Sequence, residues 1–267
     1  MHRLLTFALA LVVVGCTCGG AGPATSSPTA TIAPSGSPTQ VPLAGSITVF
    51  AGSSLTDAFK KAGDQLKVKN PGTDFVFNFG SSSTLATQII NGAPADVFAS
   101  ADEANMQKIV DAKLTESAPA IFVSNRLQIA VAAGNPKRIT GLADLAKPGL
   151  IVVLAAPTVP AGKYALEALQ KAGVTVKPAS QEVDVRAVLN KVTLGEADAG
   201  IVYVTDVKSA GAKVAGVDIP EQHQVVARYP IAVVKEAKNP RLAKAYVDYL
   251  LSDDGQRLLA EFGFSKP

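Results

Sequence analysis

The pattern of hydrophobic and polar positions changes its period repeatedly after residue 45. In residues 46–51 every second position is apolar, which predicts a strand with one buried face, whereas in residues 55–66 apolar side chains recur every three or four positions, which predicts an amphipathic helix. This alternation continues to the end of the chain and predicts an α/β fold with largely parallel sheets. Strands are predicted at residues 46–51, 74–79, 96–99, 127–132, 150–154, 200–204 and 231–234. Helices are predicted over 55–66, 85–89, 164–172 and 185–192, then from Pro240 and over 255–262.

Local signals mark where these helices begin and end. Gly92, Gly173 and Gly195 follow apolar stripes directly, so each predicts a helix C-terminus. Ser54, followed three residues later by Asp57, has the pattern of a capping box and predicts the start of the first helix.

Two serines, Ser54 and Ser82, follow consecutive predicted strands at points where helices begin. The carboxyl ends of parallel strands and the N-termini of the following helices meet in one crevice. Free backbone N–H groups, hydroxyls and the positive end of the helix dipole attract a small anion there without a lysine or arginine. Taken singly, each of these segments is an ordinary helix start, so the pattern alone leaves a purely structural role open.

The N-terminal residues predict an exported lipoprotein. The apolar run over residues 4–14 is too short to span a bilayer but has the length of a secretory signal core. It leads into Val-Val-Gly-Cys, which resembles a bacterial lipobox, so we expect residues 1–15 to be removed and Cys16 to become the lipidated first residue, with Cys18 a bystander. Residues 16–45 are rich in Gly, Ala, Pro, Ser and Thr, carry no charge, and are expected to form a flexible tether.

Composition narrows the classes of function. The 25 basic and 22 acidic residues are spread without a basic block, so we expect no nucleic-acid partner. The chain has two histidines, His2 and His223, and two cysteines near its start, which disfavours a histidine triad, a disulfide framework and a thiolate or multi-histidine metal site. No Gly-x-Ser-x-Gly elbow occurs, and Tyr164 stands after Gly162-Lys163 where a phosphate-binding loop requires Ser or Thr. We therefore expect a binding protein without a cofactor rather than an enzyme.

Six segments resemble, in their order along the chain, the molybdate-binding proteins of ABC importers. They are VFAGSSLTDAF at 49–59, FGSSSTLA at 79–86, GAPADVFASAD at 92–102, VPAGKYA at 159–165, DVR at 184–186 and GEADAGIVY at 195–203. Any one of them can arise by chance, whereas the ordered set is specific. The chain departs from the family pattern at Gly52, where alanine is common, and at Lys163, which places a charge in a helix at the edge of the expected pocket.

The resemblance implies a type II periplasmic-binding-protein fold with two α/β lobes, each a mixed sheet flanked by helices, joined by two crossover strands that act as a hinge. Lobe 1 is expected to comprise residues 46–126 and 228–267, and lobe 2 residues 127–227. The implied function is that of a monomeric, extracytoplasmic receptor, anchored to the cell membrane through Cys16. It would bind molybdate or tungstate between the lobes and, once closed, deliver it to an ABC permease and its ATPase.

The resemblance also implies a set of ligand contacts. Ser54 and Ser82 would each give a hydroxyl and a backbone N–H, Ala161 and Val185 would each give a backbone N–H, and Tyr203 would give its phenolic O–H. These donors suit a fully ionised tetrahedral dianion, which presents only acceptor oxygens, and molybdenum would be held only as this oxyanion. A receptor for sulfate or phosphate is the alternative, although hydrogen phosphate is best met by a carboxylate that accepts its proton.

Charged residues near these segments are expected to have structural roles. Arg186 and Lys163 are expected to form surface or inter-lobe ion pairs, and the carboxylates are expected to cap helices or end strands and turns; these carboxylates are Asp57, Asp102, Asp184, Asp198 and Asp206.

Overall fold

The structure is a computed structural model that describes residues 42–267. The expected leader, Cys16 and most of the expected tether lie outside the described residues. Within the described part, no helix is long and apolar enough to cross a membrane.

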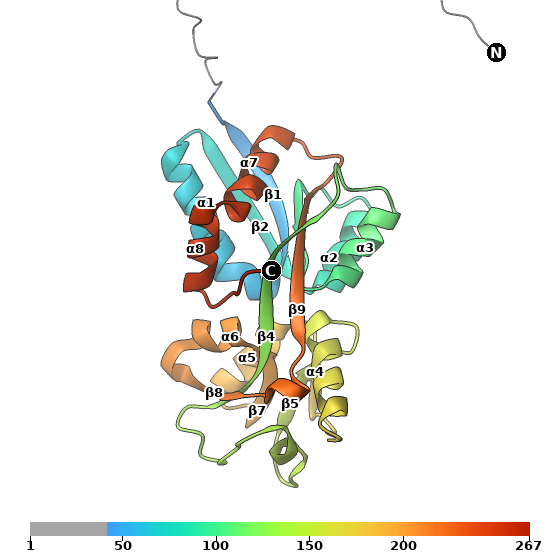
Figure 1. Cartoon of the computed structure of the whole chain (residues 1–267), viewed down its shortest axis with the longest axis vertical. Coiled ribbons are helices and arrows are strands. Elements are labelled where there is room, and N and C mark those ends of the chain that lie inside the picture. The colour runs from blue at the N-terminus through green and yellow to red at the C-terminus, as the bar shows by residue number, and fades with distance from the viewer. Residues whose placement is uncertain (1–41) are drawn as a thin grey trace, which may run out of the picture. The chain divides into compact units, whose positions relative to one another are not determined.

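The described residues form two groups of elements around a mixed sheet (Figure 1). The strands are β1 (Gly45–Gly52), β2 (Thr73–Gly80), β3 (Val97–Ala99), β4 (Ala120–Ala132), β5 (Val152–Ala155), β6 (Ser180–Glu182), β7 (Ala199–Tyr203), β8 (Val214–Asp218) and β9 (Val226–Val233). The α-helices are α1 (Thr56–Lys69), α2 (Ser82–Ile90), α3 (Glu103–Asp111), α4 (Pro160–Lys171), α5 (Val185–Thr193), α6 (Val204–Ala210), α7 (Pro240–Leu251) and α8 (Asp253–Glu261). Short 3-10 helices are η1 (Ser53–Leu55), η2 (Leu142–Ala146), η3 (Gly211–Lys213) and η4 (Glu221–His223).

The strand order is β2-β1-β3-β9-β4-β7-β5-β6, and β8 pairs with β4. Parallel pairs occur where a helix connects two strands, as between β1 and β2, β1 and β3, β5 and β6, and β5 and β7. Both β4 and β9 run antiparallel to their neighbours. The prediction of largely parallel sheets is therefore right for the pairs among β1, β2 and β3 and among β5, β6 and β7, and wrong for every pair that includes β4 or β9.

The two central strands β4 and β9 connect the two groups of elements. Through Arg126, β4 pairs with β9, and from Leu127 onward it pairs with β7. Figure 1 shows β1–β3, α1–α3, α7 and α8 at one end of these strands and β5–β8 with α4–α6 at the other; we call these groups the first and second lobe. This is the type II binding-protein architecture, with two crossover strands between two α/β lobes. The lobe boundaries expected at residues 126/127 and 227/228 stay a prediction.

The predicted helix ends are confirmed. Gly92, Gly173 and Gly195 have φ values of +89°, +65° and +74°, the left-handed conformation that closes a helix with little strain when the residue is glycine. Each lies within three residues of the end of α2, α4 or α5. The elements α3, α6, β6 and β8 were not predicted. The last three have seven, three and five residues, which is too short for a period of apolar positions to be recognised.

The strand β4 begins seven residues before the predicted strand at 127. Its first four residues are apolar, but polar residues follow at 124–126 and interrupt the apolar run. Ser124 and Asn125 are nevertheless buried and paired: the Ser124 hydroxyl donates to the Lys266 carbonyl at 2.8 Å, and Asn125 Nδ2 donates to Thr205 Oγ1 at 2.9 Å. These hydrogen bonds satisfy the polar groups that β4 buries next to the core side chains Phe122 and Val123.

Candidate functional site

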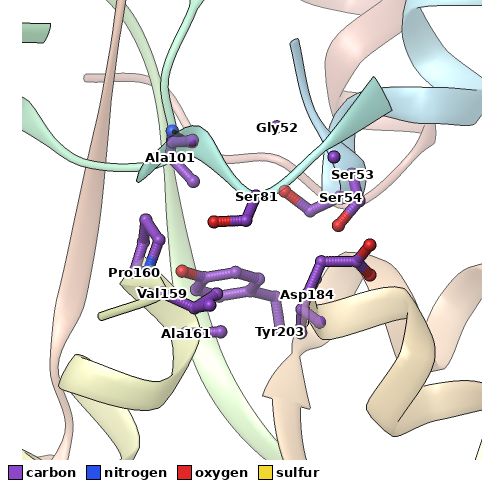
Figure 2. Close-up of a pocket in the computed structure, with 13 residues that line it drawn as sticks. Gly52, Ser53, Ser54, Ser81, Ala101, Val159, Pro160, Ala161, Asp184 and Tyr203 are labelled. Carbon is purple, nitrogen blue, oxygen red and sulfur yellow. Dashed lines mark hydrogen bonds between the residues drawn. The ribbon is translucent and has the colours of Figure 1, made fainter. Parts of the chain in front are cut away.

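A pocket lies where the two lobes face each other. First-lobe residues from the ends of β1 and β2, with Ala101, form one wall, and second-lobe residues from the starts of α4 and α5, with Tyr203, form the other (Figure 2). The lining residues are Gly52, Ser53, Ser54, Gly80, Ser81, Ser82, Ala101, Val159, Pro160, Ala161, Asp184, Val185 and Tyr203. All five residues proposed to contact an anion are among them, although they are spread over 150 positions of the chain.

The first-lobe wall presents serine hydroxyls and backbone N–H groups. Ser54 lies in η1, directly after β1, and Ser82 is the first residue of α2, directly after β2. Both side chains are buried, and Ser82 Oγ accepts a 2.9 Å hydrogen bond from the Ala101 backbone N–H. Because an amide N–H can only donate, the proton of the Ser82 hydroxyl stays available for another acceptor.

The predicted capping box at Ser54 is wrong. The helix α1 begins at Thr56, after the η1 turn, and Ser54 Oγ lies 2.9 Å from the Tyr229 hydroxyl. Asp57 does not reach back to Ser54 but pairs with Arg186 at 2.8 Å. Long-range partners thus replace the local ones that the sequence pattern indicates.

The second-lobe wall consists of two helix N-termini. Pro160 occupies the first turn of α4, where a missing N–H costs nothing, and Ala161 follows it. At α5 the predicted cap is confirmed, since the Asp184 carboxylate accepts a 3.0 Å hydrogen bond from the Ala187 N–H. The N–H groups of the first turn of each helix have no intrahelical acceptor, so both helices present positive partial charge to the pocket.

Tyr203 supplies the unusual feature of the site. Its side chain is 1% exposed, and its hydroxyl is one of two buried side-chain polar atoms without a hydrogen-bond partner among the described residues. Burial raises the pKa of this phenol well above its usual value, so the hydroxyl keeps its proton. Figure 2 places the ring between the serines of the first lobe and the α4 terminus. A buried donor left unpaired is costly, which indicates that an acceptor belongs in this pocket.

The Asp184 carboxylate is the one charged side chain among the lining residues, and the basic side chains lie around the pocket. No lysine, arginine or histidine lines the pocket, and Lys163 is exposed and lies near the Tyr164 ring instead. Arg186 forms the expected inter-lobe ion pair with Asp57 and also contacts Asp206 at 2.7 Å within the second lobe.

The Arg186 ion pairs shift the acid–base properties of their members. Burial raises the pKa of the Asp206 carboxyl to about 6, against the opposing effect of Arg186. Although burial acts to lower it, the pKa of Arg186 is raised by the charges of Asp206 and Asp57. Asp206 also accepts the Tyr203 backbone N–H at 3.0 Å, so this ion pair supports the residue that carries the unpaired hydroxyl.

The remaining predicted carboxylates have structural roles, as expected. Asp102 caps α3 by accepting from the Asn105 N–H at 3.0 Å, and Asp198 accepts from the Ile151 N–H at 2.8 Å. The described residues contain no group of three or more His, Cys, Asp or Glu side chains that could hold a metal ion.

Sequence reasoning missed two kinds of residue at this site. Ala101 and Ser81 line the pocket, and the motifs at 92–102 and 79–86 contain them, but nothing in those motifs distinguishes them from their neighbours. Tyr229 contacts Ser54 from the strand β9, and no local signal could have connected two residues that are 175 positions apart.

Comparisons with known proteins agree with this geometry. Residues 47–265 match the bacterial extracellular solute-binding protein family. The molybdate-binding protein ModA of Mycobacterium tuberculosis is 45% identical over 259 residues, covering 97% of this chain and 95% of that protein. ModA of Escherichia coli is 40% identical over 232 residues, covering 83% and 89%. A solved substrate-binding domain from Clostridium difficile is 31% identical with a TM-score of 0.64, covering 83% of this chain and 99% of that one.

The family match spans most of the chain, the relatives align over nearly their whole length, and the two-lobed fold places its pocket at the junction between the lobes. The chain therefore belongs to the bacterial extracellular solute-binding proteins, in the group that contains the ModA proteins.

Proposed function

We propose that this protein is an extracytoplasmic receptor that binds molybdate between its lobes and delivers it to an ABC permease and its ATPase. The observation that carries the proposal is the buried, unpaired Tyr203 hydroxyl in a pocket formed by helix N-termini and serines. The names of the relatives in M. tuberculosis and E. coli support molybdate as the ligand.

The chemistry of the proposed contacts suits a fully ionised tetrahedral dianion. Ser54 and Ser82 would each donate through a hydroxyl and a backbone N–H, Ala161 and Val185 through a backbone N–H, and Tyr203 through its phenol. Neutral donors in a desolvated pocket stabilise a dianion without a counter-charge that would also attract other anions. Tungstate has the same charge and nearly the same size, so we propose that it binds as well.

Sulfate and phosphate are the alternative ligands of the same class. The donors at Ala161 and Val185 are fixed by their helices, so the cavity cannot contract freely around the smaller sulfate. Phosphate near neutral pH carries a proton, and the one carboxylate that lines the pocket, Asp184, already accepts the Ala187 N–H. An unmatched buried proton costs roughly 1 to 3 kcal/mol.

Isothermal calorimetry of the purified protein tests this assignment with molybdate, tungstate, sulfate and phosphate under identical conditions. We expect molybdate and tungstate to bind with similar affinity and both to exceed sulfate and phosphate by at least tenfold. If sulfate or phosphate bound more tightly than molybdate, that anion would be the ligand, and the assignment of the protein as an oxyanion receptor would stand. If none of the four anions bound, the receptor proposal itself would fall.

We also propose that Cys16 anchors the receptor to the cell membrane. A diacylglyceryl thioether supplies two acyl chains, and two chains anchor stably where one binds only marginally. We expect Cys16→Ser to abolish labelling with a radioactive fatty acid in cells and Cys18→Ser to leave it intact. The reverse pattern would identify Cys18 as the lipidated residue.

A receptor of this kind works as a monomer and performs no chemistry on its ligand. We propose that lobe closure over the anion presents a surface the permease distinguishes from the open form. In this scheme residues 46–126 and 228–267 move as lobe 1 against residues 127–227 as lobe 2.

A further inference from the structure

The hydroxyl of Ser54 belongs to a chain of buried hydrogen bonds that starts in the two crossover strands. Ser54 Oγ lies 2.9 Å from the Tyr229 hydroxyl, and the Tyr229 oxygen lies 3.4 Å from Asn125 Nδ2. Asn125 Nδ2 also donates to Thr205 Oγ1 in the second lobe. All four side chains are buried, with exposed fractions of 3% or less.

The direction of donation along this chain follows from its one unambiguous member. Asn125 Oδ1 accepts the Arg126 backbone N–H at 2.9 Å, so the other end of the amide is the NH₂ group, which can only donate. The Tyr229 oxygen therefore accepts from Asn125. Either hydroxyl could donate in the Ser54–Tyr229 bond, but among the described residues Ser54 Oγ is the acceptor within reach of the Tyr229 proton, so both protons are placed without loss when Tyr229 donates to Ser54. Burial raises the pKa of Tyr229, which keeps that proton in place.

The direction of these hydrogen bonds determines where the Ser54 proton points. Because its oxygen accepts from Tyr229, its own proton is directed away from Tyr229, and the pocket is the space that Ser54 lines. Ser54 Oγ keeps a second lone pair, but to present it to a ligand proton the serine would have to turn its own O–H away from the ligand. Among the described residues the Ser54 hydroxyl has Tyr229 as its hydrogen-bond partner, and turning the O–H there would leave the Tyr229 proton without an acceptor. A buried unpaired hydroxyl of this kind is costly.

We propose that Tyr229 is a specificity-determining positioning residue, which, held by Asn125, fixes Ser54 as a hydrogen-bond donor and thereby selects oxyanions without a proton over protonated ones. This inference rests on the proposed oxyanion receptor and adds a residue that does not line the pocket. Ser82 is oriented in a similar way, but by the backbone: its oxygen accepts a hydrogen bond from the Ala101 N–H, which leaves its own proton for a ligand. Both pocket serines are thus set as donors, one by the backbone and one by a side chain from the hinge.

The test compares Tyr229→Phe with Tyr246→Phe. Tyr246 is a matched control because it is also fully buried and its hydroxyl donates one hydrogen bond, to the Phe59 carbonyl at 3.1 Å, in the first-lobe core away from the pocket. Affinity for molybdate, sulfate and phosphate is measured by calorimetry or by competition at pH 7.5. We expect Tyr229→Phe to weaken the binding of molybdate about tenfold. The dissociation constant of phosphate divided by that of molybdate should decrease, because discrimination against the protonated anion is reduced. The sulfate-to-molybdate ratio should stay within twofold, because neither anion carries a proton.

A double-mutant cycle with Ser54→Ala separates positioning from a general loss of packing. If Tyr229 acts through Ser54, the double variant binds molybdate no more weakly than Ser54→Ala alone. Independent, multiplicative losses would overturn the proposal, as would an unchanged affinity of Tyr229→Phe or a loss in Tyr246→Phe of equal size. If the unaltered protein prefers another proton-free oxyanion, the same cycle is run with that anion, so failure of the molybdate assignment and failure of the Tyr229 inference give different results.

Discussion

At the scale of single residues, the site depends on hydroxyl groups whose protons have no acceptor within the described part of the protein. Among the described residues the Tyr203 hydroxyl has no hydrogen-bond partner, and the Ser82 oxygen accepts one hydrogen bond, from the Ala101 N–H. A buried polar group without a partner destabilises the protein until a ligand satisfies it. We therefore expect the unpaired Tyr203 hydroxyl to lower the stability of the unliganded fold and to strengthen its affinity for an acceptor.

Tyr203→Phe tests whether the unpaired hydroxyl lowers the stability of the unliganded protein and raises its affinity for the anion. The substitution keeps the ring and its edge-to-face contact with Tyr229 but removes the unpaired oxygen. We expect the affinity for molybdate to fall by an amount worth about 1 to 3 kcal/mol, while the unliganded protein becomes no less stable and gains up to about 1 kcal/mol. Calorimetry and thermal unfolding without ligand give the two values.

Ser82→Ala is the comparison for Tyr203→Phe, because the Ser82 hydroxyl also has a partner within the protein. We expect it to weaken binding similarly but to reduce the stability of the unliganded fold, since the Ala101 N–H loses its acceptor. Unchanged affinity in both variants, measured on folded protein, would remove these residues from the site.

At the scale of elements, the pocket is a meeting point of helix N-termini that strands hold in place. The α4 terminus approaches the end of β5 so closely that a Cβ on Gly162 would lie 2.1 Å from the Ala156 carbonyl oxygen and 2.4 Å from that of Ala155. Only glycine allows this approach. The position of the Ala161 N–H therefore depends on a neighbour that has no side chain.

Gly162→Ala should displace the first turn of α4. We expect a loss of stability of about 1 to 3 kcal/mol, typical of overpacking, together with weaker molybdate binding because the Ala161 donor moves. Gly173→Ala is a suitable control, since Gly173 ends the same helix with open space around it and is strained only by its positive φ. It should lose stability without a comparable loss of affinity. Equal affinity losses in the two variants would argue against a role for α4 in positioning the anion.

At the scale of the whole molecule, the lobes are connected by the crossover strands and contact each other through an ion pair beside the pocket. Arg186 of the second lobe contacts Asp57 of the first at 2.8 Å while it stays paired with the buried Asp206. The Arg186 side chain is 22% exposed and that of Asp57 43% exposed, so the inter-lobe pair is partly screened by solvent. Its geometry favours the arrangement in which the lobes face each other closely.

Asp57→Asn should shift the balance toward more open lobes. Because the pair is partly exposed, we expect an effect worth roughly 1 kcal/mol, seen as a two- to tenfold weaker affinity for molybdate and a larger radius of gyration without ligand in small-angle scattering. Asp74→Asn is the control, since Asp74 pairs with Lys67 at 2.8 Å within the first lobe. It should change neither value. A radius and affinity unaltered in Asp57→Asn would show that the ion pair does not contribute to closure.

The sequence alone predicted much of this protein because the relevant signals are local. Apolar periodicity located most strands and helices, glycines marked the ends of α2, α4 and α5, and the ordered motifs led to the five lining residues Ser54, Ser82, Ala161, Val185 and Tyr203. Periodicity and helix-end signals report on neighbours within about one helical turn or along one strand, where the backbone itself fixes the spacing. The five lining residues were predicted instead from the resemblance of the ordered motifs to the molybdate-binding proteins.

Tertiary structure decided the long-range hydrogen-bond and ion-pair partners, which the local spacing of residues cannot encode. The partner of Ser54 is Tyr229 rather than Asp57, and Asp57 forms an ion pair with Arg186 at a separation of 129 residues. The fold also buries the polar residues Ser124 and Asn125 of β4. A hydroxyl or carboxylate bonds whichever partner the packed chain brings within about 3 Å, and burial strengthens the need for one. The positions of the pocket residues were therefore predictable from sequence, whereas the hydrogen bonds that direct their donors follow only from the folded arrangement.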